Sequence, residues 1–130
     1  QKVESSQTVK TTVSVPKYDP LLLASKLRKK ETDFELVDIR SAADFNRGHI
    51  LGAVSLPVYS TEMVSKSGDV EEASIKEAFK KYETTDKFLI IYAQNAYSTI
   101  PSDIAAILST DKKKVKALAV GWEEWLHLNK

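Results

Sequence analysis

The segment from Phe88 to Leu108, FLIIYAQNAYSTIPSDIAAIL, has the residue types and spacing best suited to chemistry in this chain. An apolar run that predicts a buried strand leads into a short polar loop, and a helical pattern follows. Such a loop directs backbone N–H groups toward one point, where an anion or an anionic nucleophile is stabilised. The predicted anion-binding loop comprises Ala93, Gln94, Asn95, Ala96, Tyr97, Ser98 and Thr99.

Ala93 stands at the end of the strand, where an enzyme would place its nucleophile. A methyl group cannot attack, ionise or accept a transferred group. Ser98 and Thr99 carry hydroxyls, but no general base is identifiable near them, so helix capping is expected rather than nucleophilic catalysis. No catalytic residue is therefore assigned, and the loop is expected to hold a small anion without transforming it.

Four further residues are expected to line or support a pocket at this loop: Asp38, Arg40, Arg47 and Trp122. Asp38 and Arg40 follow an apolar run, and we interpret them as an ion pair that anchors a strand end rather than a catalytic pair. Arg47 either draws anions toward the pocket or is a solvated helix end. Trp122 follows a strand pattern and could wall the pocket, whereas Trp125 is expected in the core.

The two histidines of the chain, His49 and His127, do not have the spacing of metal ligands. His49 is expected to make a structural hydrogen bond. The chain has no cysteine, which excludes disulfides, thiolate metal sites and thiol catalysis for this sequence as it stands. No metal or other cofactor is predicted.

Strand and helix patterns alternate along the chain and would position the loop. Asp19 precedes Pro20, and Ser41 precedes a short pattern through Phe45, so each is expected to start a helix. Helices are also expected at 75–82, from about residue 99, and at 122–128, with strands at 13–15, 34–39, 53–57, 88–92 and 115–120. This order predicts an α/β domain whose mainly parallel sheet binds ligands beyond the carboxyl ends of its strands. Residues 60–73 are polar, and their role stays open.

Length and charge narrow the possible functions. The 130 residues, 42% of them apolar, indicate one domain, assigned to residues 11–130 behind a polar tether at residues 1–10. Lys and Arg total 19 against 18 Asp and Glu, which gives no reason to expect nucleic-acid binding, and no apolar run is long enough for a membrane span. The polar start at Gln1 fits an exported protein, periplasmic or anchored as a lipoprotein, and equally an excised domain, with a cytoplasmic location left open.

The stretch LVDIRSAADFNRGHILGAVSLP, from Leu36 to Pro57, resembles the signature of the rhodanese family. The shared features are an Asp-x-Arg at a strand end, an acidic-aromatic pair, Gly-His-Ile-x-Gly-Ala and a short strand that ends in proline. VKALAVGWEEW, from Val115 to Trp125, is similar to the family's last strand with its glycine and tryptophans. The resemblance covers about residues 11–128 and implies the rhodanese-like fold, a five-stranded mainly parallel sheet with helices on both faces.

Active rhodaneses are sulfurtransferases whose loop runs Cys-x-x-Gly-x-Arg-Ser. The cysteine, at the end of the fourth strand, takes sulfur from thiosulfate or a related donor, holds it as a persulfide and passes it to cyanide or another thiol. On this sequence the cysteine falls on Ala93, the glycine on Ala96 and the arginine on Ser98, and only Thr99 keeps the expected hydroxyl. The scaffold therefore resembles the family closely, and the reactive loop resembles it poorly.

Three interpretations remain open at this point. In the first, the domain has diverged naturally, is non-catalytic and binds a small anion or a protein partner. In the second, it is a thiosulfate-type sulfurtransferase whose cysteine at position 93 was replaced by design. The third, a phosphatase relative of the same fold, is weaker, because that relative also needs the cysteine and the arginine. The sequence does not indicate the sulfur donor or acceptor, the partner or the oligomeric state.

Overall fold

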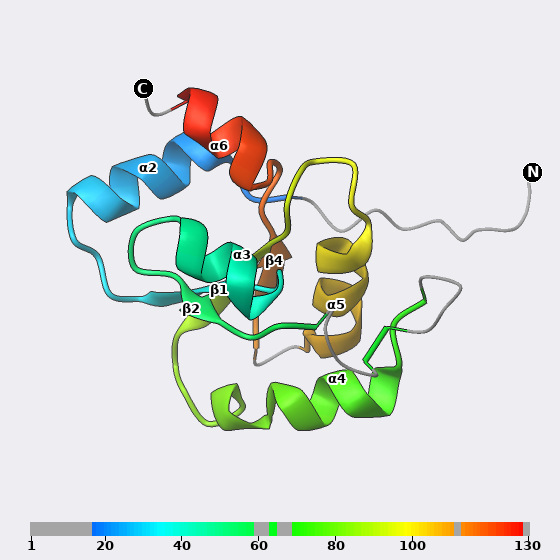
Figure 1. Ribbon diagram of the computed structural model, residues 1–130. Coiled ribbons are helices and arrows are strands. Elements are labelled where there is room, and N and C mark those ends of the chain that lie inside the picture. The colour runs from blue at the N-terminus through cyan, green and yellow to red at the C-terminus, as the bar shows by residue number, and fades with distance from the viewer. Residues whose placement is uncertain (1–16, 59–62, 65–68, 111–112, 129–130) are drawn as a thin grey trace, which may run out of the picture.

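A computed structural model describes residues 17–58, 63–64, 69–110 and 113–128 of the chain (Figure 1). Its sheet has the order β2-β1-β3-β4, and every neighbouring pair of strands is parallel. The strands are β1 (Phe34–Asp38), β2 (Val54–Ser55), β3 (Phe88–Tyr92) and β4 (Val115–Ala117). The α/β class with a parallel sheet, expected from the alternating patterns, is confirmed.

The number of strands differs from the expected five, because the described residues contain four. A single parallel bridge between Tyr18 and Leu118 extends the sheet beyond β4. It is held by hydrogen bonds from the Tyr18 amide to the Ala117 carbonyl (2.7 Å) and from the Ala119 amide to the Tyr18 carbonyl (2.9 Å). On the carboxyl side of Tyr18 this pairing does not continue, because Pro20 already begins a helix. The strand expected at 13–15 lies outside the described residues.

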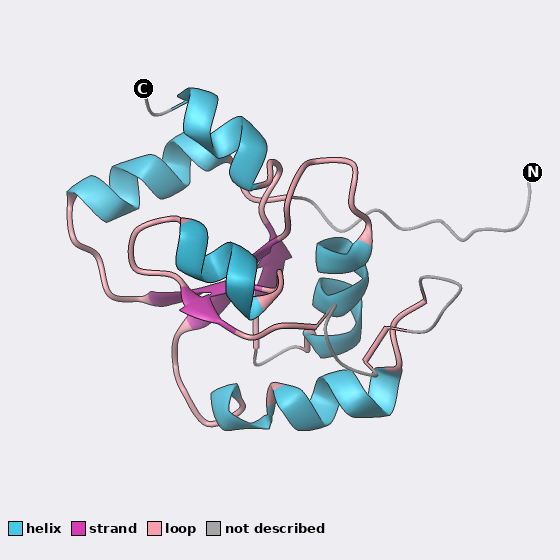
Figure 2. Cartoon of the chain, in the orientation of Figure 1, coloured by secondary structure: helices cyan, strands magenta, loops and turns pink. Residues whose placement is uncertain are grey.

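Helices cover both faces of the sheet, as the resemblance implied (Figure 2). One face carries α2 (Pro20–Arg28), α3 (Ala42–Arg47) and α6 (Trp122–Leu128), and the other carries α4 (Glu72–Ala78), the 3-10 helix η1 (Lys80–Tyr82) and α5 (Ile100–Leu108). Neighbouring side chains along a strand point to opposite faces. In β3, Ile90 therefore packs in the cluster with Leu23 and Trp125, while Ile91 packs in the cluster with Ile104.

Two of the predicted helix starts are confirmed by side-chain caps. The Asp19 carboxylate accepts a hydrogen bond from the Leu21 amide (2.8 Å), with Pro20 as the first helical residue of α2. The Ser41 hydroxyl accepts one from the Asp44 amide (3.2 Å). α3 ends at Arg47, two residues past the expected end.

The sequence indicates no role for residues 60–73, which include most of the connection before α4. Residues 59–62 and 65–68 lie outside the described part of the chain. Val64 forms an antiparallel bridge with Val70, and the Glu71 amide donates to the Met63 carbonyl (2.7 Å). The side chains of Met63, Val64 and Val70 pack against the core cluster on the α4 and α5 face. The described part of this connection therefore covers the core.

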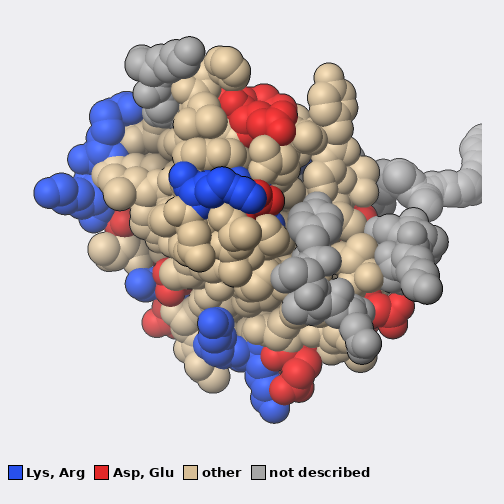
Figure 3. Space-filling model, in the orientation of Figure 1, with Lys and Arg blue, Asp and Glu red and all other residues tan. Residues whose placement is uncertain are grey.

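Side chains of both charges occur on the visible surface, with uncharged areas between them (Figure 3). Basic and acidic side chains lie interspersed on the face drawn in Figure 3. Among the described residues, no helix is long and apolar enough to cross a membrane.

Candidate functional site

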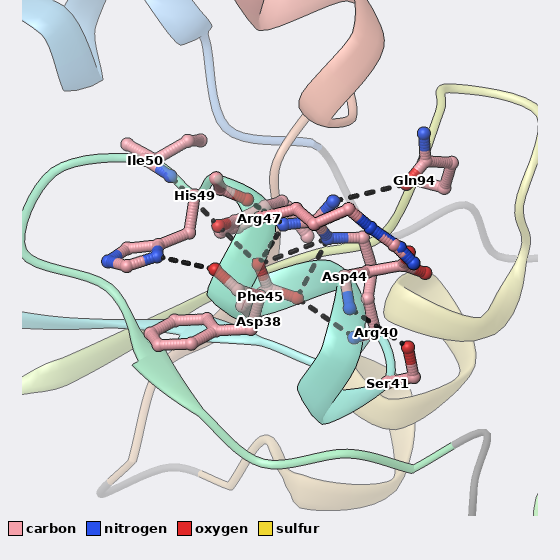
Figure 4. A network of polar contacts seen from close by, with 11 residues as sticks. Asp38, Arg40, Ser41, Asp44, Phe45, Arg47, His49, Ile50 and Gln94 are labelled. Atoms are coloured by element: carbon pink, nitrogen blue, oxygen red, sulfur yellow. Dashed lines mark hydrogen bonds and ion pairs between the residues drawn. The ribbon is translucent and has the colours of Figure 1, made fainter.

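A buried network of polar side chains lies at the carboxyl ends of β1 and β3 (Figure 4). Asp38 and Arg40 are 0% and 3% exposed, and the carboxylate accepts hydrogen bonds from Arg40 Nε (3.1 Å to each oxygen) and Nη2 (2.8 Å). Desolvation opposes the positive charge, but the hydrogen bonds and the negative charge of Asp38 hold the pKa of Arg40 above its ordinary value. The two residues thus form the ion pair at the end of β1 that we expected.

Arg40 extends the network to three other segments. Its Nη1 donates to the side-chain oxygen of Gln94 (3.2 Å), and its Nη2 donates to the Gly48 carbonyl (2.6 Å). The guanidinium carbon Cζ of Arg40 lies over the ring of Trp122, 5.3 Å from the ring centroid. The Arg40 guanidinium therefore contacts groups from the loop after β3, the end of α3 and the start of α6.

Tyr92 ties the same carboxylate to the turn before β2. Its hydroxyl donates to Asp38 (2.6 Å) and accepts a hydrogen bond from the Ile50 amide (3.1 Å). Burial, and next the hydrogen bond to Asp38, raise the pKa of Tyr92 well above its ordinary value. The hydroxyl consequently stays protonated and serves as a fixed donor beneath the loop.

The loop 93–99 begins at Ala93, which is 2% exposed at the end of β3. The carbonyls of Ala93 and Gln94 accept hydrogen bonds from the amides of Trp122 (3.0 Å) and Glu123 (2.9 Å). This close approach requires a glycine just before α6, because a Cβ at Gly121 would lie 2.3 Å from the Asn95 nitrogen. The loop is thus fixed against the first turn of α6.

A carboxylate of the protein itself binds the loop. Both oxygens of Glu124 lie 3.1 Å from the amide nitrogen of Ala96, and one also accepts from the Gly121 amide (2.8 Å). Desolvation raises the pKa of Glu124, but hydrogen bonds from the backbone amides outweigh it, so that the pKa lies below its ordinary value. The ionised Glu124 side chain therefore accepts the hydrogen bond of the Ala96 amide, which we expected to face an external anion.

The next amides of the loop also have partners within it. The Tyr97 amide donates to the side chain of Asn95 (3.1 Å), and the Ser98 amide donates to the Asn95 carbonyl (3.3 Å). The Ile100 amide donates to the Ser98 hydroxyl (3.4 Å). Thr99 occupies the N-cap position of α5 without a side-chain cap, because its αR backbone leaves that role to Ser98. The expected capping is thus correct for Ser98 and wrong for Thr99, and anion binding by the loop stays a prediction.

The other residues singled out from the sequence lie around this site. Trp125 is buried in the core, as expected. His49 makes the expected structural contact, because its Nδ1 lies 2.8 Å from the Phe45 carbonyl and its ring stacks on Phe45 at 3.7 Å. Arg47 is an exposed helix end paired with Asp44 at 3.1 Å. In the described part of the chain, no three His, Cys, Asp or Glu residues are grouped to hold a metal ion.

Sequence reasoning missed the residues that hold the loop in place. The sequence places Glu124 only within the expected helix at 122–128, and Gly121 only within the stretch that resembles the family's last strand. The available signal was the glycine followed by acidic residues in GWEE, directly after the last strand. That pattern indicates a tight approach and a carboxylate near a helix start, yet it does not identify which amides the carboxylate binds.

Comparison with known protein families gives one match across the domain. The family model described as "Rhodanese-like domain" matches residues 19–128. A putative mitochondrial thiosulfate sulfurtransferase of Schizosaccharomyces pombe is 29% identical over 120 residues, which cover 92% of this chain and 82% of that protein. The HTH-type transcriptional regulator Rv0324 of Mycobacterium tuberculosis is 27% identical over 108 residues, 82% of this chain. The match spans only 41% of the regulator's length.

Solved structures share the fold. The BH2092 protein of Bacillus halodurans superposes with a TM-score of 0.64 at 23% identity, over 87% of this chain and 72% of that one. The rhodanese-like domain of the Anabaena protein Alr3790 gives 0.61 at 22% identity, over 88% and 76%. The human single-domain sulfurtransferase TSTD1 gives 0.59 at 23% identity, over 89% and 99%. At these identities the likeness concerns the fold.

Proposed function

This chain belongs to the rhodanese-like domain family, and we propose that within it the chain is a non-catalytic domain that binds another protein. The position that carries the reactive cysteine in active members corresponds to Ala93. Ala93 is buried, and its methyl group offers no sulfur, charge or proton to a substrate. No persulfide can form there, so sulfur transfer through this loop has no acceptor atom.

One observation carries the proposal: the Glu124 carboxylate accepts a hydrogen bond from the loop at the place where a catalytic member binds an anionic sulfur donor. Its two oxygens lie 3.1 Å from the Ala96 amide. A thiosulfate ion approaching these amides would meet a carboxylate instead of free donors, and like charges repel. For the same reason, we favour a protein partner over a small anion as the ligand.

The loop itself supplies the binding surface that we propose. Tyr97 is 91% exposed in the middle of the loop, although large aromatic side chains usually bury part of their surface. Tyrosine is one of the residues enriched at the energetic centres of protein interfaces. The hydrogen bonds that tie the loop to α6 hold the backbone of this residue before any partner arrives, which lowers the entropic cost of binding.

The proposed loss of catalysis is tested with a variant that has a thiol at position 93. We expect Ala93→Cys to transfer no more sulfur from thiosulfate to cyanide than the parent chain, measured as thiocyanate formed, and to show no persulfide by mass spectrometry. Ala96→Cys, which adds a thiol to the same loop, is the matched control. Ala93→Cys combined with Glu124→Gln asks whether the carboxylate is what blocks the site. Turnover by Ala93→Cys alone, well above the Ala96→Cys control, would refute the view that the Glu124 carboxylate blocks the site, and it would favour a sulfurtransferase whose cysteine was replaced.

Two further measurements complete the test. The codon for position 93 in the native gene separates natural divergence from a designed replacement, and a cysteine codon would favour the sulfurtransferase. A bound protein that co-purifies from the native cells should be lost with Tyr97→Ala and kept with Leu51→Ala, which removes an apolar side chain that is 80% exposed elsewhere. Equal loss with both variants would contradict the assignment of the loop as the binding surface.

A further inference from the structure

A cavity of about 610 Å³ lies at the amino-terminal edge of the sheet. Its walls come from α4, η1 and the end of α5, with the starts of β3 and β4 between them. The loop 93–99 follows the carboxyl end of β3, so the two sites lie at opposite edges of the parallel sheet. The volume falls within the roughly 300–1,000 Å³ of small-molecule sites.

One side of this cavity is apolar, and the rest of its lining is polar or charged. Phe79, Leu89 and Val115 are buried core residues that line it. Ile107 and Leu108 line it as well, and they are only partly buried although they pack against the same core. Walls of this kind offer water no hydrogen bonds, so water within them is held weakly and an apolar ligand displaces it favourably.

One buried polar side chain also lines the cavity. Tyr82 is 8% exposed, and within the described part of the chain its hydroxyl makes no hydrogen bond. Buried hydroxyls in folded proteins nearly always have a partner, from the protein, from water or from a ligand. A ligand with a single hydrogen-bonding group would supply that partner.

The charges at the rim do not suit an anion. The Lys113 ammonium donates to the carbonyls of Thr85 and Lys87, and Lys76 pairs with Glu72 at 2.9 Å. Both lysines of the lining are therefore already engaged. Glu83 and Asp86 also line the cavity, and neither forms an ion pair within the described residues. The two lysines and two carboxylates of the lining therefore give the opening no net positive charge that would attract an anion.

We propose that this cavity binds an uncharged, mainly apolar small molecule of about the size of a substituted naphthalene, with one hydrogen-bonding group for Tyr82. The apolar part of the wall supplies most of the affinity, the tyrosine hydroxyl sets the orientation, and the rim has no net positive charge to attract an anion. The site shares no residue with the loop 93–99, so its function is independent of the one proposed for that loop.

The first experiment uses two fluorescent dyes that brighten in apolar surroundings. The uncharged dye N-phenyl-1-naphthylamine should bind the protein saturably, and more tightly than the anionic dye 8-anilinonaphthalene-1-sulfonate. Ile107→Trp or, as a second variant, Leu108→Trp fills the cavity from a partly exposed position and should weaken binding about tenfold or more. Leu51→Trp adds the same side chain at a residue that is 80% exposed and outside the lining, and it should leave binding unchanged.

The second experiment tests the hydroxyl of Tyr82. As competitors of the uncharged dye, 1-naphthol should be about two- to tenfold stronger than naphthalene, as expected of one hydrogen bond, and Tyr82→Phe should remove that difference. Tighter binding of the anionic dye, undiminished binding by both filled variants, or equal loss in Leu51→Trp would overturn the proposal. A preference for 1-naphthol that survives Tyr82→Phe would overturn the role of the tyrosine.

Discussion

Replacing Asp38 by asparagine should destabilise the fold severely. The carboxylate accepts hydrogen bonds from Arg40 and Tyr92, and it is fully buried. Asparagine keeps the shape but removes the negative charge, so the Arg40 guanidinium, 3% exposed, stays in the interior with only neutral acceptors, Gln94 and Gly48. Removing one partner of a buried ion pair costs about 3–5 kcal/mol.

That loss is large beside the total stability of a domain, about 5–15 kcal/mol. Urea denaturation at neutral pH, followed by circular dichroism, measures it as a fall in the free energy of unfolding at unchanged slope. In thermal melts the same loss should lower Tm by roughly 10–20 °C for a chain of this size.

The matched control is an exposed ion pair of the same chain. Lys76 and Glu72 lie 2.9 Å apart on the surface of α4, where their side chains are 55% and 65% exposed. Glu72→Gln should cost no more than about 0.5 kcal/mol, because solvent screens such pairs. If Asp38→Asn lost less than about 1 kcal/mol, or no more than Glu72→Gln, the view that this network anchors the strand ends would be refuted.

Two further predictions concern the contact between the loop and α6. Because the folded-state pKa of Glu124 is lowered, its carboxylate stabilises the fold above the unfolded pKa of about 4.3, and this contribution disappears as the pH falls through the folded value. Glu124→Gln should therefore cost about 1–2 kcal/mol at pH 7 and progressively less as the pH falls below the unfolded pKa in urea titrations, and a pH-independent difference would contradict the assignment. Gly121→Ala should cost about 1–3 kcal/mol and speed hydrogen exchange at residues 94–97, because its Cβ would meet the Asn95 nitrogen at 2.3 Å. Gly52→Ala, at φ +87° with open space around it, should cost less and leave that exchange unchanged.

Local patterns predicted the scaffold well. The apolar runs became strands because alternate residues of FLIIY bury on opposite faces, and Asp19 and Ser41 cap helices because their side chains reach amides two or three residues ahead. These interactions are short in sequence, so the pattern contains them. Of the five expected strands, the one at 13–15 lies outside the described residues, and the other four form the sheet.

The site was predicted less completely, because it is built by contacts far apart in the chain. The Ala96 amide meets a carboxylate 28 residues further on, and Arg40 reaches Gln94 across 54 residues. The sequence indicates where such groups stand, but their meeting depends on the packing of α6 against the loop. The cavity between α4 and α5 also lies outside what a linear pattern can predict, since its lining comes from five separate elements and connections.

The contact between Glu124 and Ala96 also bears on ancestry. If a mutation places a thiol at position 93 while Glu124 remains, the carboxylate competes with the thiolate for the backbone N–H groups of the loop. If Glu124 is lost first, the amides of Ala96 and Gly121 lose their hydrogen-bond acceptor, and the fold becomes less stable before any catalytic gain. If the domain descends from a sulfurtransferase, both orders of reverse mutation pass through an intermediate that is less stable or less active. The contact between Glu124 and Ala96 therefore makes a return to sulfur transfer improbable in evolution.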